Sequence, residues 1–503
     1  RFAEKCCEAD IIWVGPSPDN LAIFGNKIEA TALAKKLQIF TLPSSPKLES
    51  SSDLKNFLRT LKENDKAILK ASHGGGGRGM RIVDVKQNLD KVFAGAMKEV
   101  SLAFGSTDLY AEKFLSEARH IEVQILGDGY GKIIVLGDRD CSLQRRHQKI
   151  IEIAPAPFLK EKIRSDLYDF SKRLTENVKY KGLGTVEFLV DDNEEEYYFI
   201  ELNPRLQVEH TVTEEVYGLD LVRIQMLVAL GCEVGKLVEE KHLKPLGCSM
   251  QLRLNAEKYD LNNGVMPSTG IVEVFKPPTG HGIRTDVGLM EGGEVTGVFD
   301  SLLAKIVVHS TISDYSALWR RAERSLKEFK IGGIHTNLEF LKFVASHSEV
   351  VGVRSTTRTI DHLLDSFLRN SSQSVTSIAP KSGDGNYLLN THISGIVVES
   401  YPVVGKAVEK GGVAFVIEAM KMHHEVFYPI SGKVTEISVN QDDFIKEGET
   451  LCIMESDGVN ERTATFRKST IDLEANRLDL SETISRNALS LDISRPEAVD
   501  KRH

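Results

Sequence analysis

The sequence predicts an α+β protein with an antiparallel sheet, joined to a small all-β domain. Strand-like and helix-like segments are mixed over the first 366 residues, a polar low-complexity segment follows, and a short β-rich unit is then repeated once. At 503 residues the chain is too long for one hydrophobic core, so we expect several domains.

Composition narrows the classes of function. A net charge of −9 argues against nucleic acid as a partner, because phosphate binding needs a basic surface. We expect no membrane partner, because no apolar stretch is long enough to span a bilayer. The six cysteines have no metal-ligand spacing and favour free, buried thiols over a zinc site.

The first segments predict a strand, a turn and a helix. Residues 10–14 are an apolar run typical of a buried strand, residues 15–18 form a Gly/Pro turn, and a helix is expected from Lys27 to Leu37. Residues 66–83 then predict a strand, a glycine-rich loop at 74–79 and a second strand.

The middle of the chain predicts further strands and two amphipathic helices. Apolar residues recur every three or four positions at 163–178 and at 315–329, which is typical of one buried helix face. The strands are expected at 121–126, 133–136, 185–190 and 197–202.

The last third of the chain changes character. Residues 370–386 are rich in Ser, Gly, Asn and Pro, which predicts a flexible linker. Beyond it, Ile393-Ser394-Gly395 recurs as Ile430-Ser431-Gly432, and Gly411 matches Gly448 at the same offset of 37. Two short β-rich halves indicate a small barrel or flattened sandwich with two-fold pseudosymmetry.

The glycine loop is a candidate phosphate site. Four consecutive glycines let backbone N–H groups close around phosphate oxygens, and Arg78 adds positive charge. A flexible surface loop is the alternative. The loop lacks the Gly-Lys-Ser/Thr ending of a P-loop.

Carboxylates on two expected strands form a candidate metal site. Glu201 and Asn203 are two positions apart and therefore share one face of a strand, and Glu187 belongs to the neighbouring strand. Two carboxylates and an amide oxygen suit Mg²⁺ bound to nucleotide phosphates. The alternative is a row of solvent-facing polar residues.

Two further motifs are unusual. The run from Arg139 to Lys149 gathers basic side chains, which suit anion binding in an acidic chain, although a solvated loop is the alternative. In the middle of the repeat, Lys421 lies between two methionines in the sequence Glu-Ala-Met-Lys-Met at 418–422, and the corresponding turn of the second half has no such residues.

Together these motifs resemble a known family. Residues 418–422 are similar to the biotinylation motif of biotin carboxyl carrier domains, whereas lipoyl domains place their lysine in an Asp-Lys-Ala setting. Residues 1–366 resemble the biotin carboxylases of the ATP-grasp superfamily. The shared segments are 70–72 with the glycine loop, 112–115, 139–149, 152–157, 201–213, 253–257 and 300–305.

The resemblance implies a role for each matched residue. The residues implied to hold ATP phosphates are Lys27, Lys70, Gly75, Gly76 and Gly77. Those implied to frame the adenine are Glu112, Lys113 and Leu115, with His120, Gln144 and His147 nearby. The implied ligands of Mg²⁺ or Mn²⁺ are Glu187, Glu201 and Asn203. The residues implied to position bicarbonate are Lys149, Arg205, Gln207 and Val208. Glu209 would be the base, Arg253 would steady the enolate form of biotin, and Lys421 would carry biotin.

The same resemblance implies an ATP-grasp biotin carboxylase with a truncated N-terminal domain, followed by a biotinyl/lipoyl-like barrel. Phe299 replaces the family's usual Tyr, and the opening strand–helix units are missing, so we expect a piece of a longer protein. The implied domains are an N-terminal remnant at 1–43, an ATP-grasp domain at 44–247 with a lid at about 44–115, a carboxylase C-terminal domain at 248–366, a linker at 367–387, a carrier domain at 388–456 and a tail at 457–503.

The implied activity is that of an ATP-dependent ligase. It activates bicarbonate as carboxyphosphate and carboxylates the biotin on Lys421, and the carboxybiotin would supply a carboxyltransferase that acts on an acyl-CoA. The acyl-CoA is favoured because only a short linker separates carboxylase and carrier, and because the tail resembles a lead-in to a carboxyltransferase domain. A pyruvate-type carboxylase is the alternative.

Two other classes fit less well. A non-biotin ATP-grasp ligase would share Glu187, Glu201 and the glycine loop but has no use for Lys421. A carrier scaffold with a degenerate enzyme domain would show losses at Lys149, Glu209 or Arg253, and the sequence retains all three. The implied partners are bicarbonate, a carboxyltransferase domain or subunit, biotin protein ligase and further copies of the chain in a homo-oligomer. We expect a cytoplasmic location, with the mitochondrial matrix as the alternative in a eukaryote.

Overall fold

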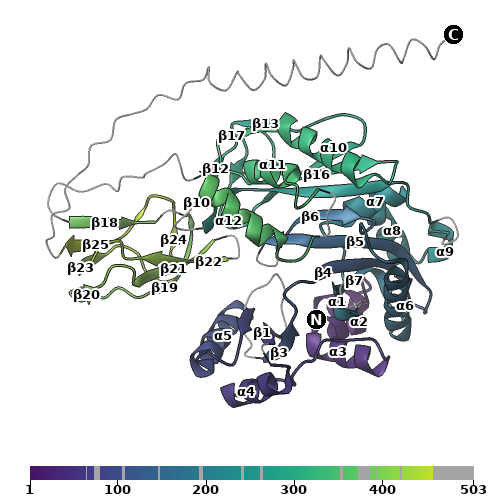
Figure 1. Ribbon diagram of the computed structural model, residues 1–503, viewed down its shortest axis with the longest axis horizontal. Coiled ribbons are helices and arrows are strands. Elements are labelled where there is room, and N and C mark those ends of the chain that lie inside the picture. Colours follow the sequence, from purple (N-terminus) through teal and green to yellow (C-terminus); the bar gives the residue numbers. More distant parts are fainter. Residues whose placement is uncertain are drawn as a thin grey trace, which may run out of the picture. The chain divides into compact units, whose positions relative to one another are not determined.

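An eight-stranded antiparallel sheet carries the architecture (Figure 1). Its strand order is β14 (Ile283–Val287), β16 (Leu302–Ser310), β9 (Cys248–Asn255), β6 (Gln148–Ala154), β5 (Ile133–Arg145), β4 (Arg119–Asp128), β7 (Lys181–Asp191) and β8 (Glu196–Asn203). The predicted antiparallel sheet is confirmed. The strand expected at 133–136 continues to Arg145, so most of the basic run lies on buried strands instead of in a solvated loop.

The computed structural model describes most of the chain up to residue 456. None of the helices in this part is long and apolar enough to cross a membrane. The linker expected at 370–386 falls largely outside this part, since only its ends are described, as the last residues of a helix and the first residue of a strand. The residues not described are 64, 73–79, 105–107, 146–147, 192–195, 240–242, 261–263, 352–354, 372–385, 392, 420–421 and 457–503.

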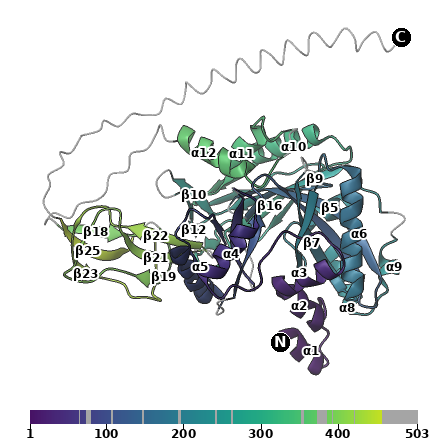
Figure 2. The ribbon, with the colours of Figure 1, turned by 60° about the horizontal axis from the view of Figure 1, so that its bottom comes forward.

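Helices cover both faces of the sheet. Three helices, α10 (Tyr315–Glu328), α11 (Leu338–Ser346) and α12 (Thr359–Ser371), lie side by side and share a core with β6, β9 and β16 (Figures 1 and 2). On β4, β5 and β7, α3 (Lys27–Lys36) and α6 (Glu161–Asn177) cover one face, and α8 (Leu221–Ala229) and α9 (Val234–Leu237) cover the other. The helices predicted at 27–37, 163–178 and 315–329 are therefore confirmed to within two residues.

The glycine-rich segment connects two strands of a separate small sheet. Its order is β2 (Arg81–Val83), β1 (Lys66–Ala71) and β3 (Leu109–Phe114), and it packs on α4 (Ser51–Thr60) and α5 (Leu89–Phe104). The remaining elements of the first 371 residues are α1 (Phe2–Glu8), α2 (Pro18–Gly25), α7 (His210–Tyr217), β10 (Glu257–Asp260), β11 (Gly264–Pro267), β12 (Gly270–Ile271), β13 (Val274–Lys276), β15 (Glu294–Val295) and β17 (Lys330–Gly332).

The strand expected at 10–14 is wrong. The structure has helix α1 before this segment and no strand within it, and Ile11 and Ile12 are each 60% exposed. An apolar run becomes a buried strand only where a neighbouring strand satisfies its backbone groups. In the described residues no strand pairs with this segment, which leaves α1 through a turn at Asp10 with a φ angle of 56°.

The C-terminal β-rich unit consists of two four-stranded sheets. Its two halves follow the sequence repeat: Val397 and Val434 are both fully buried, and Gly411 and Gly448 have nearly equal positive φ angles of 85° and 88°. The expected two-fold repeat of a small all-β unit is thereby confirmed. The sheets are β18 (Asn386–Asn390), β25 (Thr450–Ser456), β23 (Gly432–Ile437) and β20 (Ala407–Val408), and β22 (Met422–Phe427), β21 (Val413–Ala419), β19 (Gly395–Ser400) and β24 (Phe444–Ile445).

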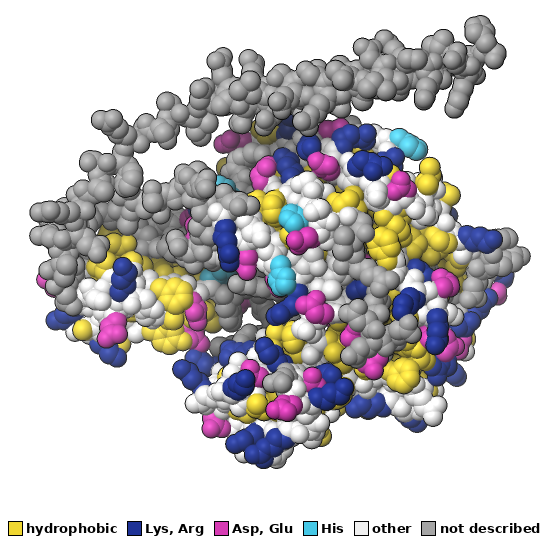
Figure 3. All heavy atoms as spheres, viewed as in Figure 1, with side chains coloured by type: hydrophobic (Ala, Val, Ile, Leu, Met, Phe, Trp, Pro, Cys, Tyr) yellow, Lys and Arg dark blue, Asp and Glu magenta, His cyan; other side chains and the backbone are white. Residues whose placement is uncertain are grey.

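A buried ion pair lies at the centre of the large sheet. Most charged side chains are instead on the surface, where Figure 3 shows acidic and basic residues interspersed. The Arg139 guanidinium on β5 and the Glu122 carboxylate on β4 are both fully buried, and Arg139 Nη2 lies 2.9 Å from Glu122 Oε2. Arg139 also donates to Gln124 Oε1 at 2.7 Å and to Thr185 Oγ1 on β7 at 3.1 Å. One guanidinium thus joins three neighbouring strands.

Replacing Glu122 by Gln tests how much this pair stabilises the sheet. The change keeps the volume but leaves the buried Arg139 charge uncompensated, so we expect the free energy of unfolding to fall by about 3–5 kcal/mol. Urea denaturation of the intact protein measures it. The control is Glu339→Gln, which removes a 73% exposed carboxylate beside Lys342 and should cost less than about 1 kcal/mol. Equal stability of the two variants would contradict the importance of the buried pair.

Candidate active site

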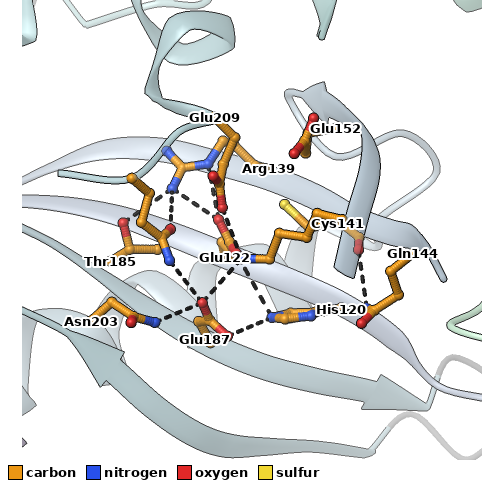
Figure 4. Close-up of polar contacts among 12 residues, drawn as sticks. His120, Glu122, Arg139, Cys141, Gln144, Glu152, Thr185, Glu187, Asn203 and Glu209 are labelled. Atoms are coloured by element: carbon orange, nitrogen blue, oxygen red, sulfur yellow. Dashed lines mark hydrogen bonds and ion pairs between the residues drawn. The ribbon is translucent and has the colours of Figure 1, made fainter. Parts of the chain in front are cut away.

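Polar side chains from several neighbouring strands of the sheet converge in one place (Figure 4). On β4, His120 and Glu122 alternate with Ile121, which packs into the apolar core on the other side. On β7, Glu187 lies between Val186 and Phe188, which belong to that same core. The period of two along each strand thus separates an ionised face from an apolar one.

Lys149 on β6 lies among three carboxylates. Its Nζ is 2.8 Å from Glu209 Oε1 and 3.2 Å from Glu187 Oε1, and it also donates a short hydrogen bond to Glu122. Burial alone would lower the pKa of Lys149, but the carboxylates, led by Glu122, raise it well above its ordinary value. Lys149 is therefore a fixed positive charge at the centre of the site.

Glu209 lies between two cations. Besides Lys149, the Arg253 guanidinium on β9 lies 3.0 Å from Glu209 Oε2. Burial alone would raise the pKa of Glu209, but Lys149 and Arg253 hold it well below its usual range. The carboxylate is thus ionised at neutral pH.

Arg253 is itself shared with a second carboxylate. The fully buried Glu152 on β6 accepts from Arg253 Nε at 2.6 Å and from Gln251 Nε2 at 3.0 Å. Burial raises the pKa of Glu152, and Arg253 opposes that rise. Glu152 thereby fixes the direction in which Arg253 faces Glu209.

The three proposed metal ligands lie together. Glu187 and Glu201 are register partners on β7 and β8, and Asn203 Nδ2 lies 2.8 Å from Glu187 Oε1 and 3.4 Å from Glu201 Oε1. Lys27, at the start of α3, lies 2.7 Å from Glu201 Oε2. Two carboxylates and an amide suit Mg²⁺ when the amide presents its oxygen, whereas here Asn203 Nδ2 faces the carboxylates.

His120 and Gln144 lie beside these ligands. His120 Nε2 is 2.9 Å from Glu187 Oε2, and its Nδ1 is 3.2 Å from Gln144 Nε2. Burial would lower the pKa of His120, but the Glu187 carboxylate raises it above its ordinary value. The imidazole thus contacts the Glu187 carboxylate through Nε2 and the Gln144 amide through Nδ1.

Three of the residues expected around the nucleotide, Lys70, Glu112 and Lys113, are on the small sheet. Lys70 on β1 lies 2.5 Å from Glu112 on β3, and Lys113 lies 3.2 Å from Asp65. Leu115 directly follows β3 and is half-buried. Gly75, Gly76, Gly77, His147 and Lys421 were also expected to be site residues, and they lie outside the described residues.

Arg205 has no contact with Glu209 among the described interactions. The Arg205 side chain is exposed and donates to the adjacent Leu206 carbonyl at 3.3 Å, whereas the cations beside Glu209 are Lys149 and Arg253. The two residues are four positions apart in a loop, where sequence spacing does not fix side-chain direction. Gln207 does face the site, with Nε2 3.0 Å from Glu187 Oε1.

Two buried charged residues of the site were not singled out from the sequence: Glu122 and Glu152. Each interrupts an apolar run by standing between two apolar residues of its strand, and a charged residue in such a place is rare unless it is paired. That interruption is the signal that would have found them.

Comparison with known proteins assigns the chain to a family. Residues 26–237 match the model of the carbamoyl-phosphate synthase L chain ATP-binding domain, residues 251–362 the biotin carboxylase C-terminal domain, and residues 390–454 the biotin-requiring enzyme domain. The chain is 37% identical over 412 residues to the pyruvate carboxylase of Bacillus subtilis, covering 81% of this chain and 34% of that protein. It therefore spans about a third of the length of this curated relative.

Solved structures agree with the sequence matches. The biotin carboxylase domain dimer of Hydrogenobacter thermophilus 2-oxoglutarate carboxylase, crystallised with MgADP and bicarbonate, is 34% identical with a TM-score of 0.68, and the match covers 72% of this chain and 79% of that one. A single-chain, multi-domain long-chain acyl-CoA carboxylase is 33% identical with a TM-score of 0.62, over 100% of this chain and 45% of that one. With its ATP-binding, carboxylase C-terminal and biotin-carrier segments in one polypeptide, the chain belongs to the biotin-dependent carboxylases, as their ATP-dependent biotin carboxylase component.

Proposed function

We propose that this chain carboxylates biotin held on Lys421, at the expense of ATP and with bicarbonate as the carbon source, in a carboxylase whose final acceptor is an acyl-CoA. The observation that carries the proposal is the ionised Glu209 carboxylate, buried between Lys149 and Arg253. A carboxylate flanked by two cations suits a base whose substrate is itself an anion.

Glu209 would accept the proton of bicarbonate. A bicarbonate oxygen would then attack the terminal phosphorus of ATP, ADP would leave, and carboxyphosphate would form. Because bound bicarbonate would share the charge of Lys149 and Arg253, the Glu209 carboxylate would become more basic when its substrate arrives. The same two cations would balance the charge on the transferring phosphoryl group.

Glu187, Glu201 and Asn203 would hold the metal. The two carboxylates are on adjacent strands and already pair with the cations Lys149 and Lys27. Mg²⁺ bound there would neutralise charge on the ATP phosphates. Lys70 would add a further positive charge from the small sheet.

The carrier unit would present biotin from the end of a hairpin. Strands β21 and β22 pair antiparallel up to Ala419 and Met422, so Lys421 is in the short connection between them in the sequence. Biotin would supply a ureido nitrogen that carries the carboxyl group between two sites. The domain limits proposed from the sequence, with a linker at 367–387, would allow this carrier to move.

The order of segments supports an acyl-CoA as acceptor. The solved long-chain acyl-CoA carboxylase matches this chain along its entire length, carrier unit included, whereas the Bacillus subtilis pyruvate carboxylase matches 81% of it. A pyruvate-type carboxylase is the alternative. Incorporation of labelled bicarbonate into acyl-CoA or into pyruvate by the intact protein distinguishes the two. A carboxyltransferase, biotin protein ligase and other copies of the chain complete the partners that we propose.

The carrier assignment is tested by intact mass. Protein made together with a biotin protein ligase should gain the mass of one biotinyl group, and Lys421→Arg should abolish the gain because arginine cannot form the amide. The control Lys410→Arg, at an exposed position of the same unit, should keep it. Biotin found on another lysine would contradict the assignment.

The base is tested by Glu209→Gln in the intact protein. We expect bicarbonate-dependent ATP cleavage to fall by at least ~10²-fold, the usual scale for loss of a general base, while ATP still binds. The measurements are steady-state ADP release and nucleotide binding by calorimetry. Glu233→Gln, which changes a 71% exposed carboxylate, is the control. Wild-type turnover in Glu209→Gln would place the base elsewhere.

A further inference from the structure

Two backbone carbonyls in the loop before Glu209 are contacted by side chains from outside the loop. The Gln207 carbonyl lies 2.7 Å from His210 Nδ1, and the Val208 carbonyl accepts from Lys305 Nζ at 3.3 Å. Each carbonyl is coplanar with the N–H of the next residue, so these contacts fix the peptide planes that contain the Val208 and Glu209 N–H groups. The two contacts therefore set the backbone direction at Glu209.

Lys305 belongs to the same sheet as the site but is not among the residues that the proposed function uses. It lies on β16 directly opposite Arg253 on β9. Its Nζ is 3.0 Å from Asp286 Oδ2 on β14, and its side chain is 14% exposed. The Lys305 ammonium thus contacts both the loop before Glu209 and the neighbouring strand β14.

The contacts continue from Asp286 back to the helix that follows Glu209. Arg284 donates to Asp286 Oδ1 at 2.8 Å and to Glu214 Oε2 on α7 at 2.8 Å. Glu214 Oε2 lies 3.8 Å from His210 Nε2. Burial alone would raise the pKa of Asp286, but Arg284 and Lys305 lower it, which keeps this carboxylate charged. Asp286, Arg284 and Glu214 thus connect Lys305 to α7, the helix that begins directly after Glu209.

We infer that Lys305 is a positioning residue, which fixes the Val208–Glu209 peptide so that the base meets bicarbonate in the correct direction. The inference rests on the proposed function, because it concerns how Glu209 and Val208 would be oriented toward bicarbonate. Lys305 contacts neither the nucleotide residues of the small sheet nor the metal ligands in the described structure. Its loss should therefore affect bicarbonate far more than ATP.

The test compares Lys305→Met, Lys305→Arg and the wild type in bicarbonate-dependent ATP cleavage by the intact protein. Methionine keeps the length but removes the charge and the donor, so kcat/KM for bicarbonate should fall between about ten- and a hundredfold, as expected for a displaced catalytic group. The KM for ATP should stay within about twofold. Arginine can still donate to the Val208 carbonyl and should recover most of the lost activity.

Two further variants complete the test. Lys276→Met, at an exposed position on β13, should behave as the wild type. Asp286→Asn removes the other partner of Lys305 and should lower kcat/KM for bicarbonate in the same direction by about threefold or more, which keeps the test valid if Lys305→Met fails to fold.

The outcomes separate the two claims. A wild-type protein whose ATP cleavage depends on bicarbonate, together with Lys305→Met and Asp286→Asn variants of unchanged bicarbonate kcat/KM, would overturn the inference alone. Equal losses for ATP and bicarbonate would also overturn it, since they would indicate a general structural role. ATP cleavage by the wild type that ignored bicarbonate would overturn the proposed function, and the inference with it.

Discussion

The buried Glu122 carboxylate is the constraint on which the rest of the site depends. A carboxylate without solvent must be paired, and here Arg139 and Lys149 both pair with it. The other N–H groups of Arg139 donate to side chains on β4, β7 and α7. Arg139 also donates to Gln207 Oε1, in the loop before Glu209, at 3.2 Å. One desolvated charge therefore orders three strands and the loop around it.

In the site as a whole, buried cations and carboxylates alternate. Lys149 is shared by three carboxylates, and Arg253 is shared by Glu209 and Glu152, so each cation has more than one anionic partner. Such sharing suits an enzyme whose substrates are anions, because the arriving phosphate or bicarbonate can draw on cations that are already in place. Preorganised charge of this kind lowers the cost of reorganisation during the reaction.

Much of the fold and part of the site could be predicted from the sequence. Residues two apart on a strand share a face, which correctly brought Glu201 and Asn203 together, and helix periodicity found α6 and α10. Loops carry no such rule, so the sequence did not predict that Lys149 and Arg253 flank Glu209. The strand expected at 10–14 also failed, because an apolar run does not reveal whether a neighbouring strand is present to pair with it.

The large sheet crosses the boundary between the two matched enzyme segments. Strands β4 to β8 come from residues 119–203 and carry Lys149 and the carboxylates, whereas β9 and β16 come from residues 248–310 and carry Arg253 and Lys305. The pairing of β6 with β9 joins the two. The two segments are thus separate in the sequence, but both contribute residues to one site. In a chimaera that takes the C-terminal segment from one relative and the ATP-binding segment from another, the cations on β9 and β16 would face a base from a different protein. Such a chimaera would be active only if β9 paired with β6 in the native register.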